Sequence, residues 1–259
     1  MMTRHVISFL YHEVTDNPKI SGFQVVGALP YIHKVSHFLS DLDLILKHFK
    51  KSESVINLSS LKDMLNLILT FDDGGSSAVS IAKILSDKGL VGHFFITTSM
   101  IGADTFLNTD QIKNIRKMGH VIGTHSHTHP SIFRDLSYDQ KIDEWGKSKK
   151  ILEDILGEKI STASIPGGDM DDDTIRAAGD VGIEFLFTSE PSYRPYEKFG
   201  VLVFGRVCPK NTTAASQINQ WAQGKGFLKS LLIRKAKNFM RISLKPLYSV
   251  FVKKGKSTL

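Results

Sequence analysis

Cysteine and long apolar runs are the features that this sequence has least of. Its 259 residues include one cysteine, Cys208, which excludes an intrachain disulfide and a metal site built on several thiolates. No apolar run approaches the roughly 18 residues of a membrane span, and the N-terminal run of about six apolar residues is too short for the core of a signal peptide. These absences predict a cytoplasmic protein.

Acidic residues are absent from the last quarter of the chain. The last is Glu197, and residues 198–259 carry 13 Lys and Arg, so the overall charge of +7 leaves −6 on the first 197 residues. We therefore divide the chain into a domain of residues 1–210 and a basic, amphipathic C-terminal extension of residues 211–259. The extension indicates an anionic membrane surface as a partner, or a helix packed on the domain with its lysines in solvent. Nucleic acid is disfavoured because aromatic residues for base stacking are sparse.

Strands and helices alternate along the domain. Strands are expected at 5–11, 54–58, 65–71, 93–97, 121–124, 160–165, 183–187 and 201–204, and helices near 38–49, 76–88, 109–118, 137–156 and 171–181. Residues 15–30 read as a loop. This alternation predicts an α/β fold with a parallel sheet, and seven or eight such units favour a closed barrel.

Two adjacent carboxylates, Asp72 and Asp73, stand where one of these strands ends. The apolar run 65–71 stops there, and Gly74 and Gly75 follow before the next helix begins. Reactive groups collect at the carboxyl ends of strands in parallel α/β folds. Taken alone, an Asp-Asp-Gly sequence is more typical of a turn whose aspartate caps the next helix.

A histidine-rich segment follows a later strand. His125 and His129 are separated by three residues, with His127 between them, and Pro130 ends any regular structure. Two imidazoles and a carboxylate from a separate strand end can bind a divalent metal ion and leave a coordination position open, as catalytic metal sites do. The two segments together therefore indicate a catalytic metal site.

The segments Thr70-Phe71-Asp72-Asp73-Gly74 and His125-Ser126-His127-Thr128-His129 resemble the first two motifs of the polysaccharide deacetylases, carbohydrate esterase family four. The resemblance covers roughly residues 5–210 and implies a distorted (β/α)7-type barrel with parallel strands. It implies that Asp72 is the general base and that Asp73, His125 and His129 bind one metal ion. Zinc suits these ligands best, and cobalt, nickel or manganese can occupy the same site.

Two later motifs of the family are incomplete in this chain. Ser164-Ile165-Pro166-Gly167-Gly168 matches the third motif, R-x-P-aromatic-G, but a serine replaces the arginine that orients the base, and Gly167 replaces the aromatic that walls the sugar groove. The last motif, Leu-x-His, supplies a general acid. No histidine follows His129, and the corresponding strand reads Val203-Phe204-Gly205-Arg206. The acid role stays open between His12, water and, less favoured, His127.

Five residues that follow expected strands are candidate contacts for the substrate: His12, Pro166, Gly167, Gly168 and Arg206. His12 belongs to a Tyr-His pair that resembles one near the sugar site of family members, or it is a strand-end histidine bonded to backbone. The Pro-Gly-Gly backbone can approach a sugar or donate an N–H to an oxyanion. Arg206 can hold an anion but cannot donate a proton usefully at neutral pH.

Two functions are compatible with these features. The first is a metal-dependent hydrolase that removes acetyl groups, most readily N-acetyl, from a sugar, a polysaccharide precursor or a carrier-linked oligosaccharide, at the inner face of the membrane if the extension binds there. The second is a catalytically silent carbohydrate-binding barrel that retains the metal. The incomplete motifs favour the second, whereas Asp72 favours the first, because a binding protein needs no general base.

Overall fold

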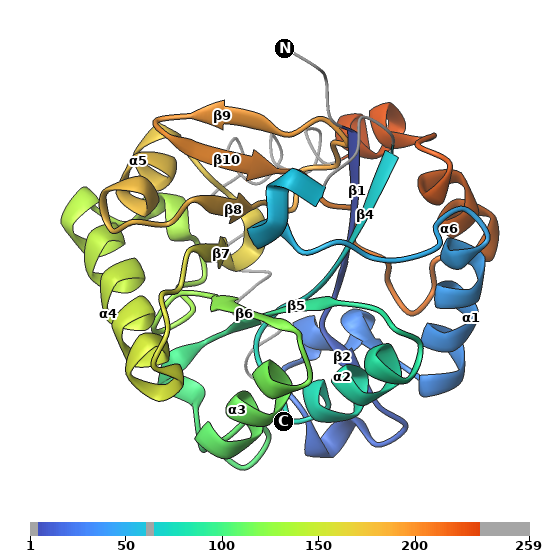
Figure 1. Cartoon of the computed structure of the whole chain (residues 1–259), viewed down its shortest axis with the longest axis horizontal. Coiled ribbons are helices and arrows are strands. Elements are labelled where there is room, and N and C mark those ends of the chain that lie inside the picture. Colours follow the sequence, from blue (N-terminus) through green and yellow to red (C-terminus); the bar gives the residue numbers. More distant parts are fainter. Residues whose placement is uncertain (1–4, 61–64, 234–259) are drawn as a thin grey trace.

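A curled sheet of eight strands forms the centre of the computed structural model, which describes residues 5–60 and 65–233 (Figure 1). Its strand order is β1-β4-β5-β6-β7-β8-β10-β9. The strands are β1 (His5–Tyr11), β4 (Leu65–Phe71), β5 (Gly92–Ile96), β6 (Val121–Thr124), β7 (Thr162–Ser164), β8 (Phe185–Phe187), β9 (Tyr196–Lys198) and β10 (Val201–Phe204). Neighbours pair in parallel, except that β9 runs antiparallel to β10.

The sheet curls until its first strand meets the chain just beyond β10. Val207 lies beside Phe9 in a parallel bridge. The N–H of Leu10 donates to the carbonyl of Val207 at 2.8 Å, and the N–H of Val207 donates to the carbonyl of Ser8 at 2.9 Å. This contact joins the two ends of the parallel set, β1 and β10. The predicted fold, a distorted (β/α)7-type barrel with parallel strands, is confirmed.

Helices cover the outer face of the sheet (Figure 1). They are α1 (Val35–Leu46), α2 (Ala78–Asp87), α3 (Thr109–Lys117), α4 (Tyr138–Leu156), α5 (Asp172–Asp180) and α6 (Ala215–Ala222). Local sequence fixes several ends: α3 and α4 begin with capping boxes at Asn108 and Ser137, and α4 ends at Gly157 in the left-handed conformation. The helices predicted from apolar periodicity are therefore present.

Short elements differ from the sequence-based expectation. The strand expected at 54–58 is wrong, because Val55–Ser60 forms 3₁₀ turns. The loop expected at 15–30 contains the 3₁₀ helices Pro18–Ile20 and Val26–Tyr31, between the two-residue strands β2 (Glu13–Val14) and β3 (Ile32–His33). Strand β9 was not expected either. Elements this short display no apolar period that distinguishes a strand from a turn.

Side chains alternate between two apolar layers along each strand. On β1, Ile7, Phe9 and Tyr11 pack in the layer beneath the helices, whereas Val6 packs inside the barrel. The interior layer also contains Ile68 from β4 and the aromatic side chains Phe95, Phe187 and Phe204. The period of two along a strand therefore builds an aromatic floor inside the barrel, and the next inward positions along β4, Thr70 and then Asp72, lie beyond it toward the strand ends.

The C-terminal extension is described as far as residue 233. Its helix α6 packs on α1 and buries Ile218 and Trp221, and Phe227 lies edge-on to Tyr193 with ring centroids 5.2 Å apart. Most of the basic amphipathic segment predicted there lies outside the described residues. Among the helices that are described, none has the length and apolar character needed to cross a membrane.

Alanine substitutions at two glycines test the packing of the barrel, because we expect them to change the free energy of unfolding in opposite directions. A Cβ at Gly123 of β6 would overlap Thr162 Oγ1 and lie 2.6 Å from the Phe95 ring, whereas a Cβ at Gly146 of α4 would meet nothing closer than Val181 at 3.7 Å. We expect Gly123→Ala to lower the free energy of unfolding by about 1–3 kcal/mol. Gly146→Ala should raise it by about 0.5–1 kcal/mol, because alanine is the better helix former. Urea unfolding measures both, and a Gly123→Ala protein as stable as wild type would contradict the packing.

Candidate active site

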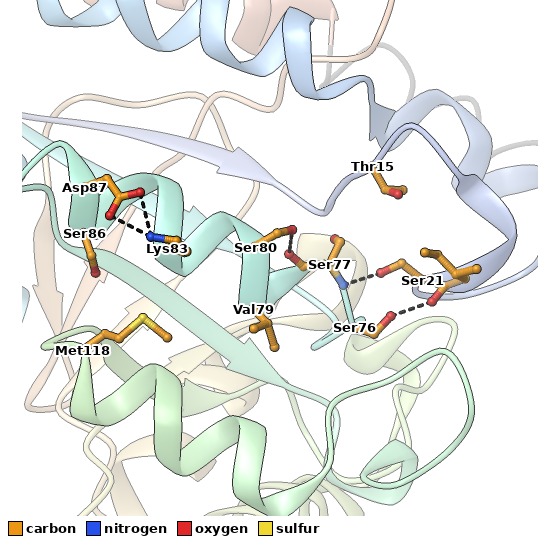
Figure 2. A pocket seen from close by; sticks show the side chains of 11 residues that line it. Thr15, Ser21, Ser76, Ser77, Val79, Ser80, Lys83, Ser86, Asp87 and Met118 are labelled. Carbon is orange, nitrogen blue, oxygen red and sulfur yellow. Dashed lines mark hydrogen bonds and ion pairs between the residues drawn. The ribbon is translucent and has the colours of Figure 1, made fainter.

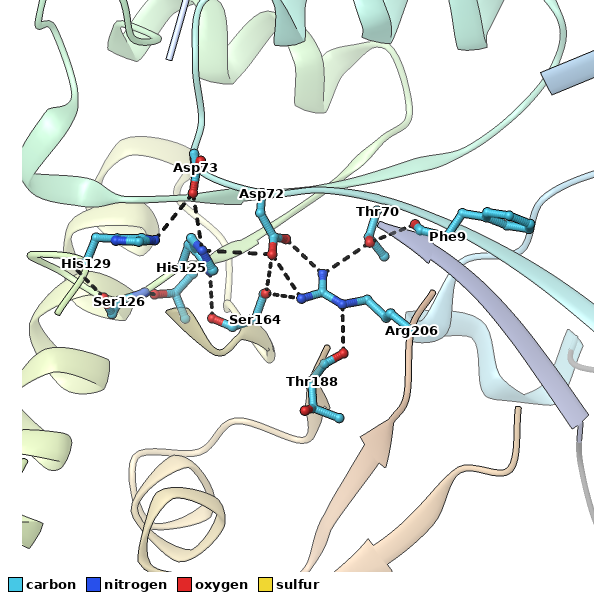
Figure 3. A network of polar contacts seen from close by, with 11 residues as sticks. Phe9, Thr70, Asp72, Asp73, His125, Ser126, His129, Ser164, Thr188 and Arg206 are labelled. Atoms are coloured by element: carbon cyan, nitrogen blue, oxygen red, sulfur yellow. Dashed lines mark hydrogen bonds and ion pairs between the residues drawn. The ribbon is translucent and has the colours of Figure 1, made fainter. Parts of the chain in front are cut away.

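The predicted functional side chains meet at the carboxyl-terminal ends of the parallel strands (Figure 3). Asp72 and Asp73 follow β4, His125 follows β6, and Arg206 lies beyond β10. Because neighbouring strands are parallel, these ends share one rim of the barrel. The structure thus brings together residues that are more than 130 positions apart in the sequence.

Asp73, His125 and His129 form a cluster with the geometry of a metal site. Oδ1 of Asp73 lies 3.4 Å from Nε2 of His125 and 3.5 Å from Nε2 of His129, and the three ligand atoms lie within 4.8 Å of one another. Among the described residues, this buried oxygen has no hydrogen-bond partner. A carboxylate oxygen that lacks a donor but faces two imidazole nitrogens is what a divalent ion would satisfy, so the three residues fit the implied metal.

The ligand segments adopt backbone conformations that non-glycine residues rarely take. The φ angles of Asp73, Ser126 and His129 are 78°, 65° and 55°. Such left-handed residues cost on the order of 1 kcal/mol or more each and persist where the surroundings hold them. In the histidine segment, the N–H of Ser126 donates to Thr124 Oγ1 at 3.0 Å, and the N–H of His129 donates to Ser126 Oγ at 3.1 Å.

A glutamate of α4 accepts two backbone hydrogen bonds from the same histidine segment. One carboxylate oxygen of Glu144 accepts the backbone N–H groups of His127 and Thr128, each at 2.8 Å. The ring of His127 turns to Thr98, with Nδ1 3.0 Å from Oγ1. The ring of His127 is therefore engaged with Thr98, and His127 does not belong to the ligand cluster.

One hydrogen bond fixes the tautomer of His125. Its Nδ1 lies 2.8 Å from the carbonyl oxygen of Ser164, which only accepts, so Nδ1 carries the proton and Nε2 faces Asp73. Burial alone would lower the pKa of His125, but the charges of Asp72 and Asp73 outweigh it and raise this pKa. Burial would raise the pKa of Asp73, and the contact with His125 and the nearby imidazoles lower it instead. The cluster therefore favours positive charge at its centre.

Arg206 binds Asp72 through both carboxylate oxygens. Nη1 donates to Oδ1 at 2.8 Å and Nη2 to Oδ2 at 2.9 Å, and the guanidinium is fully buried. Ser164 Oγ also donates to Oδ2 of Asp72, at 2.8 Å. Burial would raise the pKa of Asp72, but the adjacent Arg206 and then His125 outweigh it and hold this pKa below its ordinary value. Asp72 is therefore ionised at neutral pH and able to accept a proton.

The remaining donors of Arg206 are also used within the protein. Nε donates to the Thr188 carbonyl at 3.0 Å, Nη1 also to Thr70 Oγ1 at 3.1 Å, and Nη2 also to Ser164 Oγ at 2.7 Å. A guanidinium has five N–H donors, and all five have protein acceptors here. Arg206 therefore binds Asp72 and has no N–H group left for another acceptor, whereas the sequence predicted that it contacts the substrate.

His12 lies at the rim between the carboxylates and Tyr31. Its ring is partly buried, with the Tyr31 ring at a centroid distance of 4.9 Å. Nδ1 has no hydrogen-bond partner among the described residues, so the alternative of a histidine satisfied by backbone through this atom does not apply. Burial lowers the pKa of His12, although Asp73 and Asp72 oppose the shift.

The Pro-Gly-Gly segment forms a 3₁₀ turn at the end of β7. Gly167 and Gly168 have φ angles of 65° and 67°, and a side chain at Gly168 would overlap Ser189. The N–H of Gly168 donates to the carbonyl of Ile165 at 2.9 Å, so this donor already has an acceptor. Gly167 is exposed, while Pro166 is buried. A substrate contact from this turn stays a prediction.

Glu13 is a buried residue of the site region that the motifs did not reveal. Its Oε2 accepts hydrogen bonds from Ser21 and from Ser77, the latter at 2.6 Å, while Oε1 has no partner among the described residues. A Cβ at Gly75 would overlap this carboxylate. The second glycine of Gly74-Gly75 is therefore required for close approach, and it was the one sequence signal of a neighbour there. Burial raises the pKa of Glu13 to about 7, against the hydrogen bonds from Ser21 and Ser77.

The segment between β2 and β3 forms a wall beside the cluster. The ring of Phe23 lies 5.0 Å from the ring of His129 and 5.0 Å from that of Phe106. A cavity of about 460 Å³ is bordered by this segment and by α2 (Figure 2). Ser21 and Ser77 line it, whereas none of the metal-cluster residues does.

Comparisons with known sequences agree with the motifs. A sequence model of the family described as polysaccharide deacetylase matches residues 63–186. Peptidoglycan-N-acetylglucosamine deacetylase PgdA of Listeria monocytogenes is 27% identical over 160 residues, which are 60% of this chain and 33% of that protein. Chitin deacetylase 1 of Cryptococcus neoformans is 27% identical over 116 residues, 44% of this chain and 24% of that protein. The chain thus spans about a quarter to a third of the length of these two relatives.

Solved structures share the fold. A polysaccharide deacetylase of Bacillus cereus matches with a TM-score of 0.71 at 18% identity, covering 85% of this chain and 69% of that chain. Streptococcus pyogenes deacetylase PplD, in complex with acetate, matches with a TM-score of 0.71 at 18% identity, covering 85% and 99%. At such identity the likeness shows the fold alone. With the family match, the predicted resemblance to the polysaccharide deacetylases is confirmed.

Metal titration tests the Asp-His-His cluster. We expect one Zn²⁺ or Co²⁺ per chain, and a loss of affinity of about 100-fold or more in Asp73→Asn, because the substitution removes an anionic ligand. His127→Ala is the matched control: it removes an imidazole from the same segment but not from the cluster. Calorimetric titration of chelator-treated protein measures both. Equal affinity of Asp73→Asn and wild type would rule out the assigned ligand set.

The buried carboxyl of Glu13 predicts a pH-dependent stability. Its pKa is raised from 4.5 to about 7, so between these values the folded protein keeps a proton that the unfolded chain has lost. The stability that protonated Glu13 contributes is complete below pH 4.5 and is lost as pH rises through 7. We expect Glu13→Gln to gain stability relative to wild type by up to roughly 3 kcal/mol between pH 4.5 and 8.

Urea unfolding across this pH range measures the difference. Glu184→Gln serves as the control, since it neutralises a side chain that is 51% exposed. If the difference in the free energy of unfolding between Glu13→Gln and wild type were the same at every pH, the raised pKa of Glu13 would be contradicted.

Proposed function

We propose that this chain, with its polysaccharide deacetylase match at residues 63–186, is a metal-dependent hydrolase that removes acetyl groups, most readily N-acetyl, from a sugar or polysaccharide precursor. One observation carries the proposal. Asp72 is buried and ionised, with its carboxylate 3.8 Å from Nε2 of His125, directly beside the Asp-His-His cluster. A base next to a three-ligand cluster suits activation of a water molecule.

Asp73, His125 and His129 would hold the metal. Two imidazoles and a carboxylate suit Zn²⁺, and Co²⁺, Ni²⁺ or Mn²⁺ fit the same donors. The metal, when bound, supplies Lewis acidity that polarises the acetyl carbonyl and acidifies water. The protein contributes the orientation, because the bond from His125 Nδ1 to the Ser164 carbonyl directs Nε2 toward Asp73.

Asp72 would act as the general base. It takes one proton from the attacking water, the hydroxyl adds to the acetyl carbon, and the C–N bond breaks, giving acetate and a free amine. The amine must receive a proton as it leaves. Arg206 cannot supply it, because arginine keeps its proton in proteins and its five N–H groups are already bonded. Water or His12 is the candidate donor. Nδ1 of His12 has no hydrogen-bond partner among the described residues, although burial lowers the pKa of this histidine.

The substrate class follows from the names of the relatives. One relative is named for peptidoglycan N-acetylglucosamine and another for chitin, both N-acetylated polysaccharides. We extend this class to the present chain as a proposal. A carrier-linked oligosaccharide, an anionic membrane surface and a cytoplasmic location stay predictions, because most of the basic segment lies outside the described residues.

Acetate release is the decisive measurement. Zinc- or cobalt-loaded protein should release acetate from chitin oligomers, peptidoglycan fragments or carrier-linked N-acetyl sugars. Asp72→Asn should lower the rate by about 10²–10⁴-fold, since it removes a general base. Chelation should abolish release and metal should restore it. Asp87→Asn, which removes a surface carboxylate that pairs with Lys83, is the control.

The silent carbohydrate-binding barrel is the second candidate. Ser164 in place of the motif arginine and Arg206 in place of the last-motif histidine favour it. It predicts that wild type and Asp72→Asn both bind one metal ion and retain sugar, and that neither releases acetate from any of these substrates.

A further inference from the structure

We propose that Arg206 is the positioning residue of the base, and that it performs from the end of β10 the role that the family motif gives to an arginine at position 164. The inference rests on the proposed function, in which Asp72 is the general base. It explains how this chain orients Asp72 although its third and last motifs differ from those of the family.

The contact between Arg206 and Asp72 fixes the orientation of the carboxylate. Two parallel N–H···O bonds of 2.8 and 2.9 Å engage both oxygens in the plane of the guanidinium. Ser164 Oγ adds a third donor at 2.8 Å. Rotation of the carboxylate about its Cβ–Cγ bond would break at least one of the paired bonds, so a single orientation is retained.

Arg206 is itself fixed by the interior of the barrel. Its Nε donates to the Thr188 carbonyl just after β8, and Nη1 donates to Thr70 on β4. The guanidinium carbon lies 5.9 Å from the centroid of Phe95 and 5.8 Å from that of Phe187, so the group rests against the aromatic floor. A planar cation held at its edge and against apolar rings cannot turn toward a substrate.

Positions 164 and 206 share a single space. Both side chains are fully buried, and Ser164 Oγ lies 2.7 Å from Nη2 of Arg206. An arginine at 164 would therefore have to occupy volume that the guanidinium of Arg206 fills. The small residue in the third motif and the large cation in the last one are complementary, which is the expected outcome if one guanidinium has moved between two strand ends.

An arginine at position 206 instead of position 164 also accounts for the absence of the histidine of the last family motif. The segment Phe204-Gly205-Arg206 ends the strand on which the Leu-x-His motif is expected, so the arginine stands where that motif would carry its general acid. A permanently charged, fully bonded guanidinium excludes proton donation from this position. The chain therefore gains an anchor for its base at the position where the acid would lie.

A conservative substitution tests the positioning role. Arg206→Lys keeps the charge but cannot form the paired bonds. We expect kcat to fall about 10–100-fold with unchanged KM and metal affinity, because a misplaced base slows the reaction without altering substrate binding. Arg116→Lys is the matched control, since Arg116 makes a two-point contact with Glu158 away from the site. Undiminished kcat in a metal-binding Arg206→Lys protein would overturn the inference.

Two further variants separate positioning from general damage to the fold. In an Asp72→Asn background, Arg206→Lys should cause no further loss of residual acetate release, because Arg206 acts through Asp72. An equal fold-loss in both backgrounds would overturn the role. The double variant Ser164→Arg/Arg206→Ser should be more active than Arg206→Ser alone. A double variant that binds metal normally yet is no more active would overturn the exchange between the two positions.

Acetate release by the wild-type protein separates a failure of the proposed function from a failure of the positioning role. If it releases no acetate from any substrate, the proposed function fails. If it releases acetate and Arg206→Lys does so equally well, the proposed function stands and the positioning role fails.

Discussion

A buried ion pair between Asp72 and Arg206 is the interaction on which the rest of the site depends. Both side chains are nearly or fully inaccessible, and a charge in such surroundings is tolerated only with a close, well-bonded partner. Removing one partner of a buried pair typically costs about 3–5 kcal/mol, because the other is left without compensation. The pair also joins the two strands that flank β1, since Asp72 follows β4 and Arg206 follows β10. Folding and the electrostatics of the proposed base therefore rest on the same two bonds.

The barrel explains why such a pair can exist. Inward positions of its strands are aromatic at mid-height and polar at the carboxyl-terminal rim, so Phe95 and Phe187 exclude water beneath Arg206 while Thr70, Ser164 and Thr188 satisfy its donors. Electrostatic interactions are stronger in this low-dielectric interior. Ser164 connects the two halves of the site: its hydroxyl donates to Asp72, and its carbonyl accepts from His125. The proposed base and a candidate metal ligand thus depend on one residue of β7.

Local sequence predicts the parts of this site that lie within short segments. Asp72, Asp73, His125 and His129 stand out because each motif is only a few residues long and ends a strand, and the alternation of elements places those ends on one rim. The residues that bind the Asp72 side chain cannot be predicted from local sequence. Ser164 is 92 and Arg206 is 134 positions away from Asp72 in the sequence. No local sequence pattern predicts that side chains so far apart in the chain contact each other. An arginine after a strand is ordinarily exposed, so Arg206 was expected at the substrate; its burial is understandable only once the position of Asp72 is known. The burial of Glu13 is not predictable from the sequence for the same reason, because its neighbour Gly75 lies at another strand end.

The position of Arg206 also constrains where a proton donor can lie. In the proposed reaction the acid would come from the rim, because the guanidinium fills the interior below Asp72. The segment that begins at the end of β1 forms the rim beside the cluster. There His12 lies against Tyr31, and Phe23 covers His129. The adjacent Glu13 anchors this segment to the start of α2 through Ser21 and Ser77. In the proposed reaction the base would thus be held by Ser164 of β7 and by Arg206 beyond β10, and the acid would come from the end of β1. Changes in the segment after β1 would then alter proton delivery while leaving the Asp72–Arg206 pair intact.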